Sequence, residues 1–334
     1  MTLRYFSKIL FFSTLFLIFI GGLVKSTESG LSVPDWPTTY GRFMFAFPMS
    51  EMVGGIRYEH THRMVASIVG LLTLALAFWL NYAERRRWVK VLGWAALFAV
   101  ILQGILGGLT VRYFLPTSIS VAHGMLAQTF FLMTITLAYS QSRERKTREG
   151  SEEKFNGTFL KLCALLLFVI YVQLILGAVM RHTESGLAIP DFPTMGGYIF
   201  PPFNNTMLNH INLWCFEHNL DLVSMAQVKI HFLHRFWALV VVGVVGFLTY
   251  FGFQNFPKNS LTIKTLIWLN GIVMTQIFLG IITVLSQKEV ITTTLHVTTG
   301  AVLLGLSMLL ILRSSPLSWG KFLVILSPEG AKNP

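Results

Sequence analysis

Apolar and polar positions alternate along this chain in blocks as long as membrane-spanning helices. Runs of about 17 to 22 mostly apolar residues are separated by polar segments, and a helix needs about 20 such residues to cross roughly 30 Å of hydrocarbon. The runs lie at about 9–25, 63–82, 91–111, 118–138, 159–180, 235–253, 264–284 and 293–312. This pattern predicts an all-α membrane protein with eight transmembrane helices.

The segments around the runs contain an internal repeat. TESGLSVPDWPT at Thr27–Thr38 recurs 156 residues later as TESGLAIPDFPT at Thr183–Thr194, each time directly after an apolar run. At an offset of 173, residues of the third run recur in the seventh, among them Gly107 as Gly280. Four runs per copy is an even number, so both copies enter the membrane from the same side. We therefore expect two tandem, parallel-repeat four-helix bundles.

The repeat divides the chain into a first unit at 1–139, a linker at 140–158 and a second unit at 159–334. Most of the 26 Lys and Arg fall on the side of the termini and the linker, as the positive-inside rule expects of a cytoplasmic side. We expect a multi-pass protein of the cell's inner (plasma) membrane with both termini cytoplasmic and both TESGL loops outside. This bias accounts for the net charge of +11, so we expect no nucleic-acid partner.

Composition agrees with a membrane protein, because 53% of the residues are hydrophobic and only 12% are charged, against about a quarter in soluble proteins. The first run could be a signal peptide, but no small-residue cleavage site follows it and its counterpart in the second unit is internal, so we count it as a helix. The two cysteines, Cys163 and Cys215, are expected near opposite membrane faces, which excludes a disulfide between them.

Four histidines are the strongest chemical signal. The segments EHTHR at 59–63 and HFLHR at 231–235 align His62 with His234, and each unit has a further histidine near the outer end of its fourth helix, His123 or His296. Ionisable groups inside a membrane are costly and usually mark function. Two imidazoles facing each other across a four-helix bundle suit the axial positions of a haem iron. Zinc or copper would need further ligands that the two units do not supply symmetrically, so haem is favoured.

These motifs together resemble the haem A synthase family over about 9–312, since both units have the TESGLxxPDxP loop, ExxHR or HxxHR, and a later histidine. The resemblance implies oxidation of a methyl group of haem O to a formyl group, giving haem A, with a b-type haem as bound cofactor. It further implies as partners the haem O-producing farnesyltransferase, terminal oxidase assembly and an electron acceptor that the sequence does not identify. The protein is expected to be embedded in the lipid bilayer, and the sequence is compatible with a homo-oligomer.

One departure from the family pattern concerns thiols. Many bacterial members of the family that this chain resembles have a cysteine pair in the first outer loop. This chain has no cysteine between residues 26 and 58. Any thiol-based step proposed for those members is therefore not expected here.

Glu59 distinguishes the two units, because His231 takes its place in the second. It lies one helical turn before His62, so its carboxylate is expected beside the bound porphyrin. There it could stabilise positive charge at an oxidised methyl group or accept a proton, and we assign it the catalytic role. A purely structural carboxylate, favoured by the helix dipole, is the alternative. The substrate haem O ligands are then His62 and His123, and the haem b ligands are His234 and His296.

Four basic residues at the outer ends of helices are candidate partners of haem propionates. They are Lys25, Arg63, Arg181 and Arg235. Snorkelling side chains that anchor the helices are an equally good interpretation. The proline-containing loops are expected to close over the outer edges of the haems, one loop for each site.

Two alternatives remain at this point. His60 and His62 lie two residues apart and point about 200° away from each other on a helix, so only one can face the bundle interior. The alignment of His60 with Phe232 favours His62, and His60 is expected to face a loop, lipid headgroups or another subunit and to be replaceable at little cost. The architecture would also suit a di-haem b electron-transfer or haem-handling protein. The enzyme is favoured because only one of the two units has the carboxylate.

Overall fold

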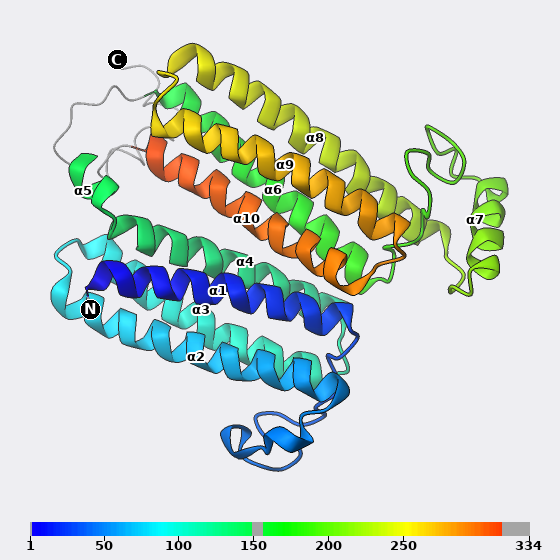
Figure 1. Ribbon diagram of the computed structural model, residues 1–334, viewed down its shortest axis with the longest axis horizontal. Coiled ribbons are helices and arrows are strands. Elements are labelled where there is room, and N and C mark those ends of the chain that lie inside the picture. The colour runs from blue at the N-terminus through cyan, green and yellow to red at the C-terminus, as the bar shows by residue number, and fades with distance from the viewer. Residues whose placement is uncertain (1, 149–155, 316–334) are drawn as a thin grey trace.

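The computed structural model describes residues 2–148 and 156–315 of the chain, and these residues are helical in eight long segments (Figure 1). Each segment contains one predicted apolar run and is long and apolar enough to span a membrane. The segments are α1 (Leu3–Ser26), α2 (Gly54–Ala83), α3 (Arg87–Arg112), α4 (Thr117–Ser140), α6 (Gly157–His182), α8 (Met225–Asn255), α9 (Leu261–Leu285) and α10 (Val290–Ser314). The prediction of eight spans is confirmed within the described residues.

The eight helices pack as two groups of four. In the first group, α1 and α3 each contact both α2 and α4, so α2 and α4 are diagonal to each other. In the second group, α6 and α9 each contact both α8 and α10, which places α8 and α10 on the diagonal. Side chains on diagonal helices face each other across the interior of a four-helix group. This geometry brings residues of the second and fourth long helix of each group together.

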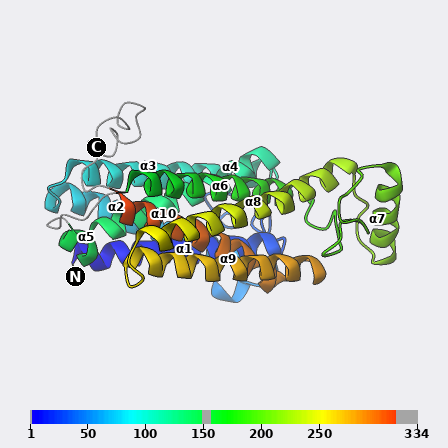
Figure 2. The ribbon, with the colours of Figure 1, turned by 90° about the horizontal axis from the view of Figure 1, so that it is seen from above.

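The two groups meet along α1, α4, α6 and α10, and Figure 1 shows them side by side with their long axes roughly aligned, whereas they overlap in the view of Figure 2. The contact is apolar and tight. Phe131 of α4 and Ala301 of α10 are buried in it, and a Cβ atom at Gly305 would lie 2.9 Å from the Cδ1 atom of Ile135. Because only hydrogen fits at Gly305, α10 and α4 approach closely at this level.

The connections at the two ends of the groups differ in length. The loop between α1 and α2 contains two short 3₁₀ helices, η1 (Met44–Ala46) and η2 (Met49–Glu51). The loop between α6 and α8 contains α7 (Asn205–Glu217), which the hydrophobic pattern does not predict. The loop with α7 lies at the end of the molecule opposite to the N-terminus and to α5 (Arg143–Arg148), as Figure 2 shows, and the first loop follows the end of α1 that is remote from the N-terminus (Figure 1).

The second loop has a small hydrophobic core of its own. Met207, Ile211 and Cys215 on one face of α7 are buried against Ile189 and Val228. Both cysteines of the chain are unpaired and buried, which agrees with the expectation that they cannot form a disulfide. Of the linker expected at 140–158, residues 149–155 lie outside the described part of the chain.

Candidate functional site

The structure brings the predicted histidine pairs together. His62 on α2 and His123 on α4 are partly buried, and their rings lie close enough to interact electrostatically. In the second group, His234 on α8 and His296 on α10 are likewise partly buried and close enough to interact electrostatically. Each pair connects the diagonal helices of its group, as the packing requires. Among the described residues, no three or more His, Cys, Asp or Glu side chains gather closely enough to hold a metal ion.

A glycine on a neighbouring helix makes room for each of these rings. A Cβ atom at Gly21 would lie 3.2 Å from Nε2 of His62, and one at Gly280 would lie 3.0 Å from Cε1 of His296. The other two rings pack in the same way, His123 against Gly107 and His234 against Gly177, at 3.3 and 3.1 Å. Any larger side chain would push the ring aside. The four glycines recur at the repeat offsets, which is the sequence signal that could have identified them.

Three glutamines also contact the histidines. The Nε2 atom of Gln103 donates to the backbone carbonyl of His123 at 2.9 Å, and that of Gln276 lies 3.5 Å from Nε2 of His296. In the second group, Gln173 adds a contact to the backbone carbonyl of His234 at 3.1 Å. Gln103 and Gln276 occupy equivalent positions of the repeat, at the offset of 173.

The donor set fits bis-histidine ligation of haem iron. The Nδ1 atoms of His123 and His296 are buried and have no hydrogen-bond partner among the described residues. A buried imidazole nitrogen normally has a partner, and one without a partner can serve as a metal ligand. Each pair thus includes a histidine whose Nδ1 atom has no partner among the described residues, and the pair lies between the diagonal helices of a four-helix group, where such cofactors bind.

The repeated loops have the same internal geometry, and we call Thr27–Thr38 the first lid and Thr183–Thr194 the second lid. Asp35 accepts hydrogen bonds from the backbone N–H groups of Tyr40 and Gly41 at 2.7 and 2.8 Å. Asp191 accepts from Gly196 and Gly197 at 2.6 and 2.9 Å. Burial opposes ionisation of both carboxyl groups, but hydrogen bonds from the hydroxyls of Thr38 and Thr194, together with these backbone bonds, hold the pKa of each below its usual value.

Arg63 fastens the first lid to α2. Its guanidinium donates to the backbone carbonyls of Asp35 at 2.6 Å and of Val33 at 2.9 Å. In the second group, Arg235 donates to the carbonyls of Asp191 at 2.9 Å and of Ile189 at 2.8 Å. The structure therefore places both arginines on the lids, although the sequence suggested them as propionate partners.

Glu59 and His231 occupy equivalent positions beneath the lids. Glu59 is buried and accepts hydrogen bonds from the backbone N–H of Val33 at 2.7 Å and from Arg63 at 2.6 Å. The two ring nitrogens of His231 lie 3.2 Å from the N–H of Ile189 and 3.1 Å from Nε of Arg235. A carboxylate can accept both bonds, whereas a neutral imidazole has one acceptor nitrogen. The first lid is therefore held by the stronger set of bonds.

His60 faces the loop side of α2, away from His123. Its ring is buried, its Nδ1 atom lies 3.1 Å from the hydroxyl of Thr39, and its ring centroid lies 5.2 Å from that of Phe47. This arrangement agrees with the assignment of His62 to the bundle interior. It also shows that His60 is part of the packing beneath the loop.

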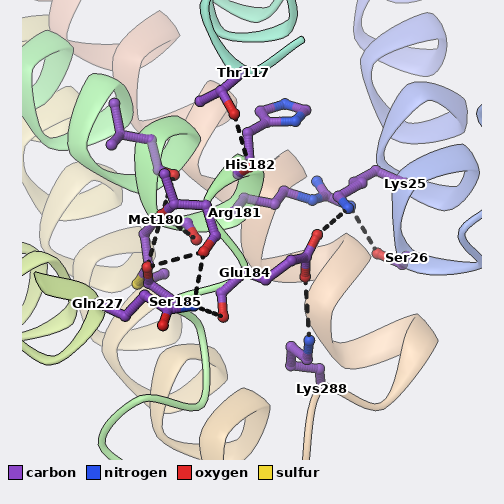
Figure 3. Close-up of polar contacts among 12 residues, drawn as sticks. Lys25, Ser26, Thr117, Met180, Arg181, His182, Glu184, Ser185, Gln227 and Lys288 are labelled. Carbon is purple, nitrogen blue, oxygen red and sulfur yellow. Dashed lines mark hydrogen bonds and ion pairs between the residues drawn. The ribbon is translucent and has the colours of Figure 1, made fainter. Parts of the chain in front are cut away.

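Lys25 and Arg181, the other two candidate propionate partners, connect the two groups at the lid end (Figure 3). Lys25 forms an ion pair of 2.5 Å with Glu184, and Arg181 donates to the carbonyl of Gly22 at 2.8 Å and to the hydroxyl of Ser26 at 2.9 Å. Burial opposes ionisation of Glu184, but the hydrogen bond and charge of Lys25 hold its pKa below the usual value. These contacts couple the end of α1 to the second lid.

Comparison with known proteins agrees with this geometry. Residues 4–308 match the COX15-CtaA family, described as cytochrome oxidase assembly protein. The chain is 28% identical to "Heme A synthase" of Beijerinckia indica subsp. indica over 326 residues, which cover 87% of each protein. It is 26% identical over 337 residues to the protein of the same name from Pelagibacter ubique, covering 91% of this chain and 93% of the relative. The relative from Halalkalibacterium halodurans, also named "Heme A synthase", is 25% identical over 301 residues and covers 88% of this chain.

The matched region includes all four paired histidines, both lids and the eight spanning helices almost to the end of α10. This chain therefore belongs to the COX15-CtaA family of cytochrome oxidase assembly proteins.

Proposed function

We propose that this chain is a haem A synthase, which oxidises a methyl group of haem O to a formyl group. His62 and His123 would hold the iron of the substrate, and His234 and His296 would hold the iron of a resident haem b. The observation that carries the proposal is the pairing of histidines across the diagonal of each four-helix group, in a chain of this family. Bound haem b would supply the one-electron redox chemistry of its iron.

The carboxylate of Glu59 supports the assignment of the substrate to the first group. It is buried one helical turn from His62, and the equivalent position in the second group holds a histidine. Near a reacting porphyrin edge, a carboxylate stabilises developing positive charge or accepts a proton better than a neutral imidazole does. Because Glu59 also binds Val33 of the first lid, the position of this carboxylate would depend on whether the lid is closed.

The layout follows the repeat. The two units, 1–139 and 159–334, would be parallel copies in the inner (plasma) membrane, joined by a cytoplasmic linker at 140–158. Both termini would then be cytoplasmic and both haem sites would lie towards the outer face. The unequal distribution of Lys and Arg and the position of both lids at one end of the molecule support this orientation. Haem O would come from its farnesyltransferase, and haem A would pass to terminal oxidase assembly.

The test is co-expression with a haem O source, followed by mass analysis of the extracted pigments. The wild-type chain should yield formyl haem. Glu59→Gln keeps an oxygen that can accept from the N–H of Val33 but removes the charge, so lid closure should survive while formyl haem falls by about 100-fold or more. Haem content should stay near the wild-type level.

The matched control is Glu28→Gln, which removes an exposed carboxylate of the same lid and should leave the yield of formyl haem unchanged. If Glu59→Gln turns over like the wild type, Glu59 has only the structural role of fastening the lid. If the wild-type chain yields no formyl haem although both haems are bound, it is a di-haem electron-transfer or haem-handling protein.

A further inference from the structure

A basic cavity lies at the end of the first group opposite to the lids. Its volume is about 910 Å³, and it is open to the surface. The start of α1, the connection between α2 and α3, and the segment from the end of α4 into α5 form its walls. Five basic side chains line it, together with one carboxylate. The basic residues are Arg4, Arg85, Arg86, Arg143 and Lys146, and the carboxylate is Glu84.

The carboxylate does not neutralise this cavity. Glu84 accepts hydrogen bonds from Arg86 at 2.8 Å and from the side-chain amide of Gln141 at 2.7 Å. Burial opposes its ionisation, but these bonds lower the pKa of Glu84 to about 2, so it stays charged and bound to Arg86. Among the described residues, no carboxylate lies within ion-pair distance of Arg4, Arg143 or Lys146. The cavity therefore has an excess of positive charge.

Arg4 supplies a second indication of a ligand. Its Nε atom is buried and has no hydrogen-bond partner among the described residues. A buried charged donor without an acceptor is costly, and a phosphate oxygen would satisfy it. The position fits as well, since the cavity lies at the ends of spanning helices, where the headgroups of a bilayer lie.

An apolar stripe leads away from the cavity along α1. Tyr5, which lines the cavity, is followed on the same helix face by Ile9, Phe12 and Phe16, at spacings of four, three and four residues. All four side chains are exposed, by 44 to 62%. A ligand with an anionic head in the cavity could therefore lay a hydrocarbon chain along this face.

We propose that this cavity binds the phosphate headgroup of an anionic phospholipid, with an acyl chain along the exposed face of α1. At the corresponding end of the second group, Arg313 is bound to Glu144. The lipid would fasten α1, α2 and α4 together at the end remote from the haem sites. This site is independent of the proposed oxidation of haem O.

The test uses the full chain, purified in an uncharged detergent and freed of lipid. Native mass spectrometry then measures binding of dioleoyl phosphatidylglycerol, of dioleoyl phosphatidylcholine and of inorganic phosphate. The wild type should bind phosphatidylglycerol at least about tenfold more tightly than phosphatidylcholine. The double variant Arg143→Gln/Lys146→Gln changes two exposed side chains and should lose this preference about tenfold or more.

The matched control is Lys258→Gln/Lys264→Gln, which removes the same charge from exposed positions at the same end of the second group. It should bind phosphatidylglycerol like the wild type. Equal binding of the two lipids by the wild type, or equal losses in the two double variants, would contradict a specific site. Inorganic phosphate that displaces phosphatidylglycerol at equal concentration would show that the ligand is free phosphate rather than lipid.

Discussion

At the scale of single residues, the glycines opposite the histidines decide where the imidazoles can lie. Gly280→Ala would put a Cβ atom 3.0 Å from Cε1 of His296, so the ring must tilt or shift by a few tenths of an ångström. If His296 holds the haem b as proposed, we expect the visible spectrum and midpoint potential of that haem to change, because axial ligand geometry tunes the iron.

The control for this change lies on the same helix. A Cβ atom at Gly271 meets nothing within 4 Å, so Gly271→Ala should leave the spectrum unchanged and stabilise α9 by up to about 1 kcal/mol. If both alanine variants have the wild-type spectrum and potential, close packing of Gly280 against His296 has no part in positioning a ligand.

His60 and His62 can be separated by replacement with alanine. His62→Ala should abolish binding of added haem at the first site, because it removes a proposed ligand of the iron. His60→Ala should retain that binding but lower stability by about 1 kcal/mol, since the ring is buried against Phe47 and contacts Thr39. The alignment alone predicts that replacing His60 costs little stability. Because its ring is buried, the structure predicts a larger loss. Severe loss of haem binding with His60→Ala, together with near-normal binding with His62→Ala, would show that His60 rather than His62 faces the interior of the first group.

At the scale of elements, the lids should respond to pH through their aspartates. The pKa of Asp35 is held below its ordinary value of 3.8, so the stabilisation of the lid is fully present above that value and is lost as the pH falls through the lowered pKa. Hydrogen exchange of the Tyr40 and Gly41 amides, corrected for the intrinsic rate, should show constant protection from pH 7 to about 4 and a loss below it.

Asp35→Asn removes the charged acceptor and should weaken protection of both amides already at pH 7, whereas Glu28→Gln should not. A loss of protection between pH 7 and 5 in the wild type would mean that another group controls the lid.

The helices and the lids differ in how far the sequence predicts them. Each spanning helix contains its predicted run, because a segment of about 20 consecutive apolar residues in a membrane satisfies its backbone hydrogen bonds by forming a helix. α7 was missed because it is short and amphipathic, and its apolar face is buried by residues outside the helix, among them Ile189 and Val228. The role of Arg63 was missed for the same reason, since its position beside His62 does not reveal that it binds carbonyls of the first lid.

At the scale of the whole molecule, the two four-helix groups are similar in packing but differ in the residues around their sites. The histidine pairs and the glycines behind them are the same in both groups, whereas Glu59 is replaced by His231 and Gln173 contacts His234 in the second group. Lys25 and Arg181 connect the groups at the lid end. Similar geometry with different chemistry is what two haems with separate roles require.

The most direct test of this account is the spectrum of the purified protein, isolated without added haem O, in single histidine variants. If haem b resides in the second group, His296→Ala and His234→Ala should lose the bis-histidine spectrum, and His123→Ala should retain it. Loss of that spectrum in His123→Ala, with wild-type spectra in His296→Ala and His234→Ala, would contradict the assignment of substrate and cofactor to the two groups.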